Sequence, residues 1–427
     1  MKQQHIRLSI AAALAAVCAP AAQAVDVTAG DWKLSFTGNV NADYIYSNCE
    51  SLDNAKNVVL GFTCVAPGDG QRSSSSVSNG LLPAALSISA ATTQAGYDIG
   101  VTFGLYPGIS TNDGGSPNLG NTSATRNTAL GTAGLDVRQV FLTFGNKEMG
   151  TVLAGRNIGL FQADAILNDM TLLGVGAEAS SNAAPTNTSL GSIGFGYIYT
   201  DWLAQINYTT PDLSGAKVTI GIFDPVESLT DGTGPTPKST PGFHGKVAYK
   251  ASDALYLSAS FLYEKQEFQR ADVTGTLITG QKVSYDGVGF DFGGKYDFAG
   301  FQVAAWLYYA KGLGTTGLFL GGAVVDPTSP AYGDTRKSYG GLAQVTYKIP
   351  ETNFKVGVNY GTSRMSRADN ENNPFLVKDN GKVTVGFYDQ LTPNLLLLAE
   401  GTPQWSTNQL GDKNKAWVAN VGAFVSF

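Results

Sequence analysis

The amino-acid sequence predicts an all-β fold: a transmembrane, antiparallel, up-and-down β-barrel of about 16 strands. Three observations support this prediction. Segments in which apolar and polar residues alternate recur along the chain, and the connections between them are alternately short and long. In addition, no apolar run of about 18 residues follows residue 24, so the sequence offers no candidate for a membrane-spanning helix.

Residues 1–24 have the features of a cleaved secretory signal peptide. A basic head precedes the apolar run Leu8–Val17, and Ala22-Gln23-Ala24 forms a small-x-small cleavage site. The apolar run has about half of the ~20 residues that a membrane helix needs. A lipoprotein signal at Cys18 is the weaker alternative, because the bulky Val17 stands where such signals carry a small residue. We expect cleavage after Ala24.

The composition of the remaining domain, residues 25–427, fits an exported barrel. The full chain carries a formal charge of -6, and loss of the two basic residues of the signal peptide makes it about -8, so we expect no nucleic-acid partner. Glycine is abundant at 52 residues, Phe and Tyr together number 40 (21 and 19), and only 15% of residues are charged. In a barrel, apolar residues face the lipid outside and polar residues face the water inside, and the two sets together give this composition.

The clearest strand pattern runs from Trp32 to Tyr46. Its even-numbered residues are apolar or small and its odd-numbered residues are mostly polar, so one face is apolar and the other polar. At ~3.3 Å per residue the segment suits a tilted membrane crossing. Similar alternation predicts fifteen more strands, at 82–90, 97–105, 137–144, 151–156, 202–208, 218–222, 243–249, 255–263, 288–298, 301–309, 339–349, 354–360, 383–387, 395–401 and 417–427.

The connections between these segments alternate in length. Short turns are expected near 94–96, 146–150, 211–215, 251–254, 297–300, 350–353 and 391–394. Long loops are expected near 47–80, 107–134, 157–196, 225–241, 264–284, 312–337, 362–379 and 402–415. Short periplasmic turns and long outer loops are typical of outer-membrane barrels. Because backbone groups in hydrocarbon need internal partners, the sheet must close, and at about 16 strands its interior is too wide for side chains alone to fill.

Four stretches resemble the trimeric general-diffusion porins of Gram-negative outer membranes. Residues 420–427 resemble the C-terminal assembly signal of outer-membrane proteins, and Arg138-Gln139-Val140-Phe141 is similar to the family's fourth strand, where the arginine commonly faces the pore. Residues 155–159, followed by the acids at 164 and 169, resemble the fifth strand and the loop that folds back into the barrel. Residues 207–215 resemble the tight turn after the sixth strand.

This resemblance implies a homotrimeric porin in outer-membrane lipid, with a water-filled channel for passive diffusion of ions and small hydrophilic solutes. It places residues 157–196 inside the barrel, with a constriction formed by Asp164, Asp169, Glu178, Arg138 and Arg156. The family's Pro-Glu-Phe-Gly-Gly run is absent, and Thr171–Gly176 stands in its place, which leaves the shape of the narrowest point open.

Charges on the predicted inner face give the channel a candidate lining. Alternation places four lysines there: Lys33, Lys246, Lys295 and Lys348. Opposed charges across a narrow lumen orient dipolar solutes and filter ions. For Arg138 the two lines of reasoning conflict, because alternation gives it the parity of the outward Val140, whereas the resemblance turns it inward; we follow the resemblance.

Two cysteines, Cys49 and Cys64, remain after the predicted cleavage. An even number in an oxidising compartment predicts a disulfide. It would close a loop of about 15 residues, worth roughly 3 kcal/mol in the chain-entropy model. A zinc site is the weaker reading, because His244 is the only histidine of residues 25–427. We therefore expect no metal and no cofactor.

Catalysis and selective transport are the main alternatives to general diffusion. No serine or aspartate near His244 completes a recognisable catalytic arrangement, so we expect no enzyme and name no catalytic residue. A substrate-selective outer-membrane channel is the serious alternative, because Tyr256, Trp306 and Tyr308 face inward by parity. A structural or adhesive barrel without an open lumen is the third.

Overall fold

The protein is described from a computed structural model, which covers residues 24–50, 56–64, 72–109, 135–178, 188–227, 238–271, 277–320, 322–325, 331 and 333–427. β-Strands dominate this part of the chain, and one short helix, α2 (Ala163–Leu167), lies between them. None of the described helical residues forms a span long and apolar enough to cross a membrane. The strands are β1 (Val25–Ala29), β2 (Trp32–Cys49), β3 (Ser73–Ser78), β4 (Ala85–Gln94), β5 (Tyr97–Pro107), β6 (Leu135–Asn146), β7 (Gly150–Ile158), β8 (Trp202–Thr209), β9 (Ala216–Phe223), β10 (Gly242–Lys250), β11 (Leu255–Ala271), β12 (Leu277–Phe298), β13 (Phe301–Lys311), β14 (Lys337–Lys348), β15 (Phe354–Ser366), β16 (Val377–Thr392), β17 (Leu395–Asn408) and β18 (Lys413–Ser426).

The strands form one closed antiparallel barrel. Each of β4 to β17 pairs with the next strand along the chain, and β18 returns to pair with β2, from Ala416 opposite Cys49 to Ser426 opposite Asn39. β3 and β4 pair with successive parts of β2, so together they occupy one strand position of the barrel wall, which we call a stave. β1 pairs with the start of β2, next to the C-terminus, and continues the stave of β18. The 18 described strands therefore make 16 staves, as predicted.

Alternation assigns the two faces of the wall. On β2, Val40 and Tyr44 are exposed on the outside, whereas Asn41 and Asp43 between them are buried on the inside. The same apolar exposure recurs around the outer surface, where lipid replaces water as the contact. Polar side chains are correspondingly gathered inside.

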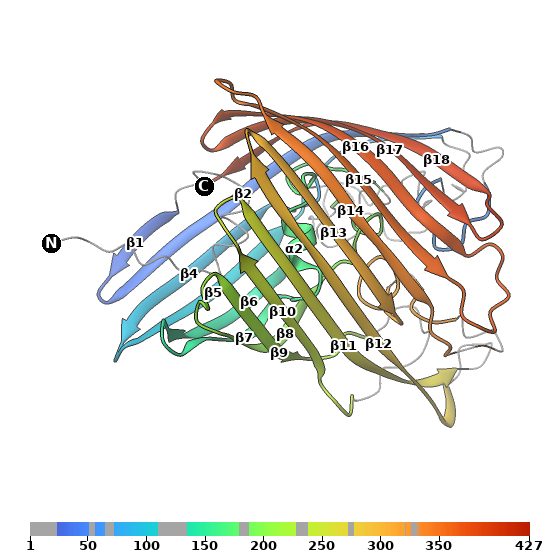
Figure 1. Cartoon of the computed structure of the whole chain (residues 1–427), viewed down its shortest axis with the longest axis horizontal. Helices are drawn as coiled ribbons and strands as arrows, with labels where there is room; N and C mark the ends of the chain where they lie inside the picture. Colours follow the sequence, from blue (N-terminus) through green and yellow to red (C-terminus); the bar gives the residue numbers. More distant parts are fainter. Residues whose placement is uncertain are drawn as a thin grey trace, which may run out of the picture.

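The two ends of the barrel differ as the connection lengths predict. Strand β1, the C-terminus and the short turns lie at one end of the barrel, and the strands lead into the long connections from the other end (Figure 1). Two left-handed residues, Ala95 and Gly96, make the turn between β4 and β5. Such two-residue turns suit hairpins that need no further structure.

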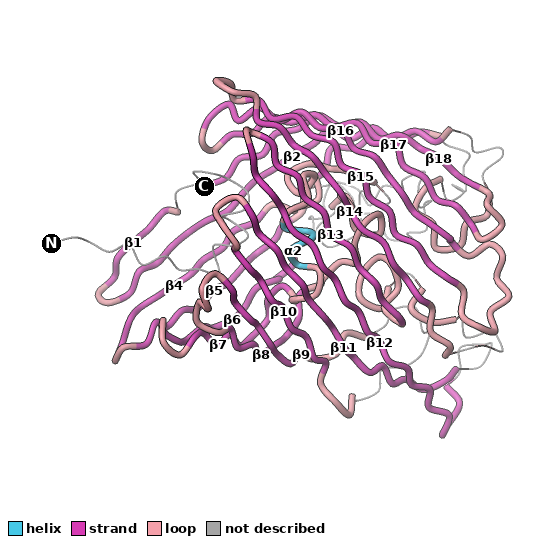
Figure 2. The backbone as a smooth tube through the Cα atoms, viewed as in Figure 1, coloured by secondary structure: helices cyan, strands magenta, loops and turns pink. Residues whose placement is uncertain are grey.

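Helix α2 lies within the outline of the barrel rather than beyond its rim (Figure 2). It belongs to the connection between β7 and β8, whose described residues, 159–178 and 188–201, we call the infolded loop. The inward position of this segment agrees with the sequence prediction for 157–196.

Some strands are longer than their alternating segments. β12 begins at Leu277, well before the predicted start at 288, and β11 continues to Ala271. β3 was not predicted, because its sequence, Ser-Ser-Ser-Ser-Val-Ser, has no apolar face. Beyond the bilayer, backbone pairing alone can extend a hairpin, so periodic hydrophobicity is no longer required there.

The Cys49–Cys64 disulfide is present, with 5.8 Å between the two Cα atoms. It ties the end of β2 to the connection that follows, and both sulfurs are buried beside Ala416 of β18. The predicted pairing is confirmed.

Replacing both cysteines by alanine should lower the free energy of unfolding by roughly 3 kcal/mol, because an unfolded loop of about 15 residues regains its freedom. Denaturant titration of the folded barrel measures this, and a single Ser76→Ala change on β3 is a control that leaves the disulfide intact. Equal unfolding midpoints for the double variant and the parent would contradict the prediction.

Candidate pore constriction

The infolded loop packs against the inner wall through apolar side chains. Ala165 and Ile166 of α2 and Leu172 beyond it join a buried cluster with Trp306 of β13 and Leu342 of β14. Burial of several aliphatic side chains contributes about 1.5 to 3 kcal/mol for each. An outer loop surrounded by water would gain nothing from these residues, so the apolar cluster explains why the loop stays inside.

Asp164 attaches the loop to the opposite strands. Its carboxylate forms an ion pair with Lys246 of β10 at 3.1 Å and accepts a hydrogen bond from the Tyr256 hydroxyl of β11 at 2.9 Å. Burial alone raises the pKa of Asp164, but the Lys246 ammonium, together with the hydrogen bonds from Tyr256, Lys246 and Ser258, outweighs burial, so the pKa lies below its usual value. The carboxylate is therefore ionised and held in place.

Substituting Lys246 by methionine should raise the pKa of Asp164, because burial remains while the main opposing charge is gone. The parent keeps its anchoring carboxylate charged between about pH 5 and pH 7, and anchoring is lost only below the ordinary aspartate pKa of about 3.9. In the variant this loss moves to higher pH. Reversal potential recorded against pH should thus be flat in the parent over this range and sloped in Lys246→Met. Two superimposable profiles would refute the ion pair.

Asp169 organises the turn after α2. Its Oδ1 accepts hydrogen bonds from the backbone N–H and the hydroxyl of Thr171, at 3.0 and 2.8 Å, and its Oδ2 accepts one from Tyr197 at 2.9 Å. The amide of Asn359 on β15 also donates to Oδ1, at 3.3 Å. Burial and the neighbouring Asp169 raise the pKa of Tyr197, which keeps that hydroxyl a donor.

The middle of the loop, around residues 175–178, is bound by β17. Glu400 accepts hydrogen bonds from the backbone N–H groups of Val175 and Gly176, both at 2.8 Å. Gln404 bonds both backbone groups of Glu178, accepting from its N–H at 3.0 Å and donating to its carbonyl at 2.8 Å. Sequence reasoning missed Glu400, although it is the only acid between 395 and 401 and has the inward parity of Leu396 and Leu398.

Arg138 points into the barrel because of a β-bulge. Gly104 of β5 pairs with Gln139, and the next residue, Leu105, pairs with Val137, so Arg138 is the extra residue of the bulge. The bulge shifts the alternation by one residue and turns the guanidinium inward, which is why parity alone gave the wrong side.

The inward guanidinium of Arg138 has acidic and aromatic neighbours. Its Nε donates to Asp136 at 2.8 Å, and its central carbon lies 5.2 Å from the ring centre of Tyr106 and 5.9 Å from that of Trp202. Such ring faces attract a cation. Arg138 is therefore held at the wall beside the start of β8.

Arg156 is not brought to the lumen. It pairs with Val140 and Ala204, whose side chains are exposed on the outer face, and it is itself exposed. Because side chains opposite each other in a sheet share a face, the constriction placement expected for Arg156 is not what the structure has.

The four predicted lining lysines occupy different places. Lys246 alone contacts the infolded loop. Lys33 pairs with Asp26 of β1 at 2.8 Å, Lys295 lies 5.9 Å from the ring centre of Tyr256, and Lys348 is exposed near the short-turn end. They do not form one cluster.

A cavity of about 220 Å³ borders the infolded loop. Its walls are mainly apolar, with Ile166 and Leu172 from the loop, Leu81 from the segment before β4, and Leu320 from the connection between β13 and β14; Arg138 also borders it. The acids Asp164 and Asp169 do not line it, since they are turned toward the wall. Among the described residues, no group of three or more His, Cys, Asp and Glu side chains could hold a metal ion.

A closed 16-stave barrel, with aromatic and aliphatic residues outside and a folded loop inside, defines a porin-type outer-membrane channel. The family model for Gram-negative porins matches residues 11–400, and the chain belongs to this family. The protein is an outer-membrane channel for passive diffusion.

Solved structures share the fold at low sequence identity. The outer-membrane channel DcaP of Acinetobacter baumannii is 16% identical, with a TM-score of 0.62 over 94% of this chain and 99% of that one. The anion-selective porin from Comamonas acidovorans is 14% identical, with a TM-score of 0.57 over 93% and 100%. OmpF of Salmonella typhi in complex with daunomycin is 12% identical, with a TM-score of 0.55 over 94% and 100%. No curated protein matches the chain by sequence.

Proposed function

We propose that the infolded loop sets the narrowest part of a water-filled channel for ions and small hydrophilic solutes. The observation that carries this proposal is the set of polar attachments between the loop and the inner wall. They come from four strands spread around the barrel: Lys246 of β10, Gln344 of β14, Asn359 of β15 and Glu400 of β17. A loop fixed at so many points across the interior leaves only part of the cross-section to solutes.

Two of the acids at this level are in ion pairs, which argues for weak ion selectivity. Asp164 faces Lys246 at 3.1 Å, and Arg138 faces Asp136 at 2.8 Å. The electric fields of two opposite charges this close largely cancel at a distance. Salt screens the remainder beyond the Debye length, which is about 8 Å at physiological salt. We therefore propose general diffusion, with Asp164 and Asp169 as part of the loop's fixed charge and Glu178 as an attachment point.

A substrate-selective channel is the second candidate, and one observation favours it. The cavity beside the loop is lined by Tyr199 and Trp202 as well as aliphatic residues, a surface that an apolar part of a solute can contact. Competition of the ion current by aromatic and aliphatic solutes of equal charge and size distinguishes the two. Equal block by both favours general diffusion.

We further propose that three copies assemble in outer-membrane lipid. The continuous apolar outer face supports contact with lipid, and the family resemblance supports the trimer. Mass determination of the detergent-solubilised protein, with the bound detergent subtracted, tests the number of copies.

Liposome swelling tests the diffusion pathway. Vesicles that contain the purified protein should swell in neutral sugars at rates that fall steeply as the sugar becomes larger, because the fixed loop sieves by size. Absence of swelling with a pentose would reject the proposed function, and rates independent of sugar size would reject the constriction.

A further inference from the structure

A second connection also lies inside the barrel. After β13 ends at Lys311, residues 312–320 and 322–325, which we call the second internal loop, pack inside the barrel. Leu313, Phe319 and Ala323 of this loop have no exposed surface. They belong to the largest buried cluster of the described residues, together with inward side chains of β8, β9, β11, β12 and β13. A loop in solvent would not bury these residues.

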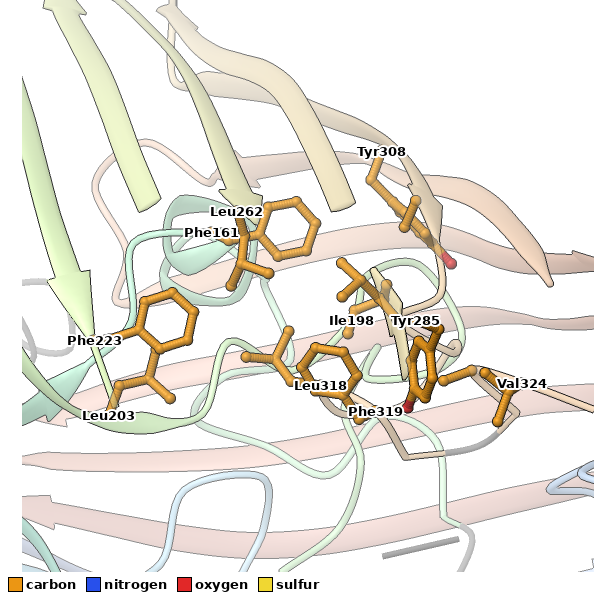
Figure 3. Packing of buried hydrophobic residues seen from close by; sticks show 13 residues of the cluster. Phe161, Ile198, Leu203, Phe223, Leu262, Tyr285, Tyr308, Leu318, Phe319 and Val324 are labelled. Atoms are coloured by element: carbon orange, nitrogen blue, oxygen red, sulfur yellow. The ribbon is translucent and has the colours of Figure 1, made fainter. Parts of the chain in front are cut away.

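The two internal loops pack against each other. In Figure 3, Phe161 and Ile198 from the infolded loop converge with Leu318 and Phe319 from the second. The backbones also meet, since the N–H of Tyr199 donates to the carbonyl of Thr316 at 2.7 Å. The infolded loop is therefore supported by this neighbour on one side and by the strands on the other.

The barrel wall is shaped to receive both loops. Gly287 and Gly289 lie on the inner face of β12, where a Cβ on Gly287 would come 2.5 Å from the ring of Phe319 and one on Gly289 would come 2.6 Å from the ring of Phe161. Real side chains cannot approach this closely. The two glycines thus leave space for one aromatic ring from each loop.

Contacts made by the residue just before β14 also hold the second internal loop in place. Arg336, just before β14, donates two hydrogen bonds to Glu371, at 2.9 and 2.7 Å, and both side chains are buried. This paired geometry is the strong, directional form of an ion pair. The N–H of Arg336 also donates to the carbonyl of Ala323 at 3.0 Å, which holds the end of the loop.

Of the described residues of the second internal loop, Leu320 is the exposed one. Leu320 is 38% exposed, in contrast to 3% for Leu318, and Leu320, Thr316 and Gly317 line the same cavity as Ile166 and Leu172 of the infolded loop. The cavity is thus bordered by both loops.

We propose that residues 312–320 and 322–325 form a second constriction element, so that solutes pass through an apolar throat between two internal loops. This inference rests on the proposed diffusion pathway and adds a second wall to it. The throat narrows the channel by volume and by apolar contact, not by a ring of charges.

Deletion of Thr315–Phe319 tests the proposal by shortening the second internal loop and removing Leu318 and Phe319, through which it packs on the wall. Gly314 and Leu320, the residues to be joined, are neighbours in the structure because they form a β-bridge. Single-channel conductance in a planar bilayer should rise on the order of twofold relative to the parent. Unchanged conductance of a correctly assembled deletion variant would overturn the proposal.

Two single-cysteine variants provide a second test if the deletion variant does not assemble. Leu320→Cys and Leu318→Cys place single free thiols on the throat and in the buried cluster, since Cys49 and Cys64 are linked. A charged, water-soluble methanethiosulfonate should reduce the current through Leu320→Cys and leave Leu318→Cys unaffected. Current that is insensitive in both variants overturns the proposal. A parent protein that conducts no ions instead rejects the proposed function itself, which separates the two failures.

Discussion

Deleting Leu167–Gly176 from the infolded loop is expected to raise single-channel conductance on the order of twofold. The deleted residues include Leu172, part of the apolar cluster on the wall, and the N–H groups that Glu400 binds. The barrel should still assemble, because all pairings between β7 and β8, from Thr151–Thr209 to Ile158–Trp202, lie outside the deletion.

The measurement needs a proof of assembly beside the current. Migration of unheated samples on denaturing gels reports the folded barrel, and far-ultraviolet circular dichroism reports its strand content. A variant that passes both tests with the conductance of the parent would show that the infolded loop does not limit the channel.

Replacing Asp164 and Asp169 together by asparagine should change the preference for ions more than it changes conductance. The substitution removes two negative charges, and loss of Asp164 leaves the Lys246 ammonium without its 3.1 Å partner. Cation preference should therefore fall. In a tenfold salt gradient we expect the reversal potential to shift by roughly 10 mV or more in the direction of anion selectivity. For comparison, a channel that passes ions of only one sign would give a reversal potential of about 59 mV in this gradient. The shift should shrink at high salt, where screening is stronger.

Asp253→Asn is a matched control for this double variant. Asp253 is an exposed acid paired with a lysine, Lys250, at 2.6 Å, but it lies in the turn before β11 rather than inside the barrel. It should leave the reversal potential unchanged. If the double variant behaves like this control, Asp164 and Asp169 do not act on permeating ions.

Alternation predicted the barrel because lipid and water impose opposite demands on successive residues of every stave. Alternation did not predict the structure where a strand has no lipid-facing side or where the pairing of two strands is irregular. The serine-rich β3 has no apolar face, and the bulge at Arg138 resets the alternation within a single strand. A bulge depends on how two strands pair, which one strand's own sequence does not specify. The family resemblance gave the side of Arg138 correctly but did not do so for Arg156, which lies on the outer face.

The constriction was predictable in outline but not in its contacts. The length of segment 157–196 and its apolar residues predicted that it lies inside the barrel. Segment 312–325 belongs to a long connection too and contains the apolar Leu313, Leu318 and Phe319, but its inward position was not predicted. The partners of the acids come from distant strands, such as Lys246 for Asp164 and Asn359 for Asp169. Such pairings depend on closure of the whole barrel, so spacing along the chain does not reveal them.

Single-channel recording of the purified protein in a planar bilayer tests the central claim most directly. A water-filled channel with two internal loops predicts discrete current steps that rise linearly with voltage, with a conductance proportional to the bulk conductivity of the salt solution. The recordings should also show a small reversal potential in a salt gradient, as paired charges imply. A barrel that inserts, as shown by its folded migration, yet produces no current steps at any voltage would contradict the account.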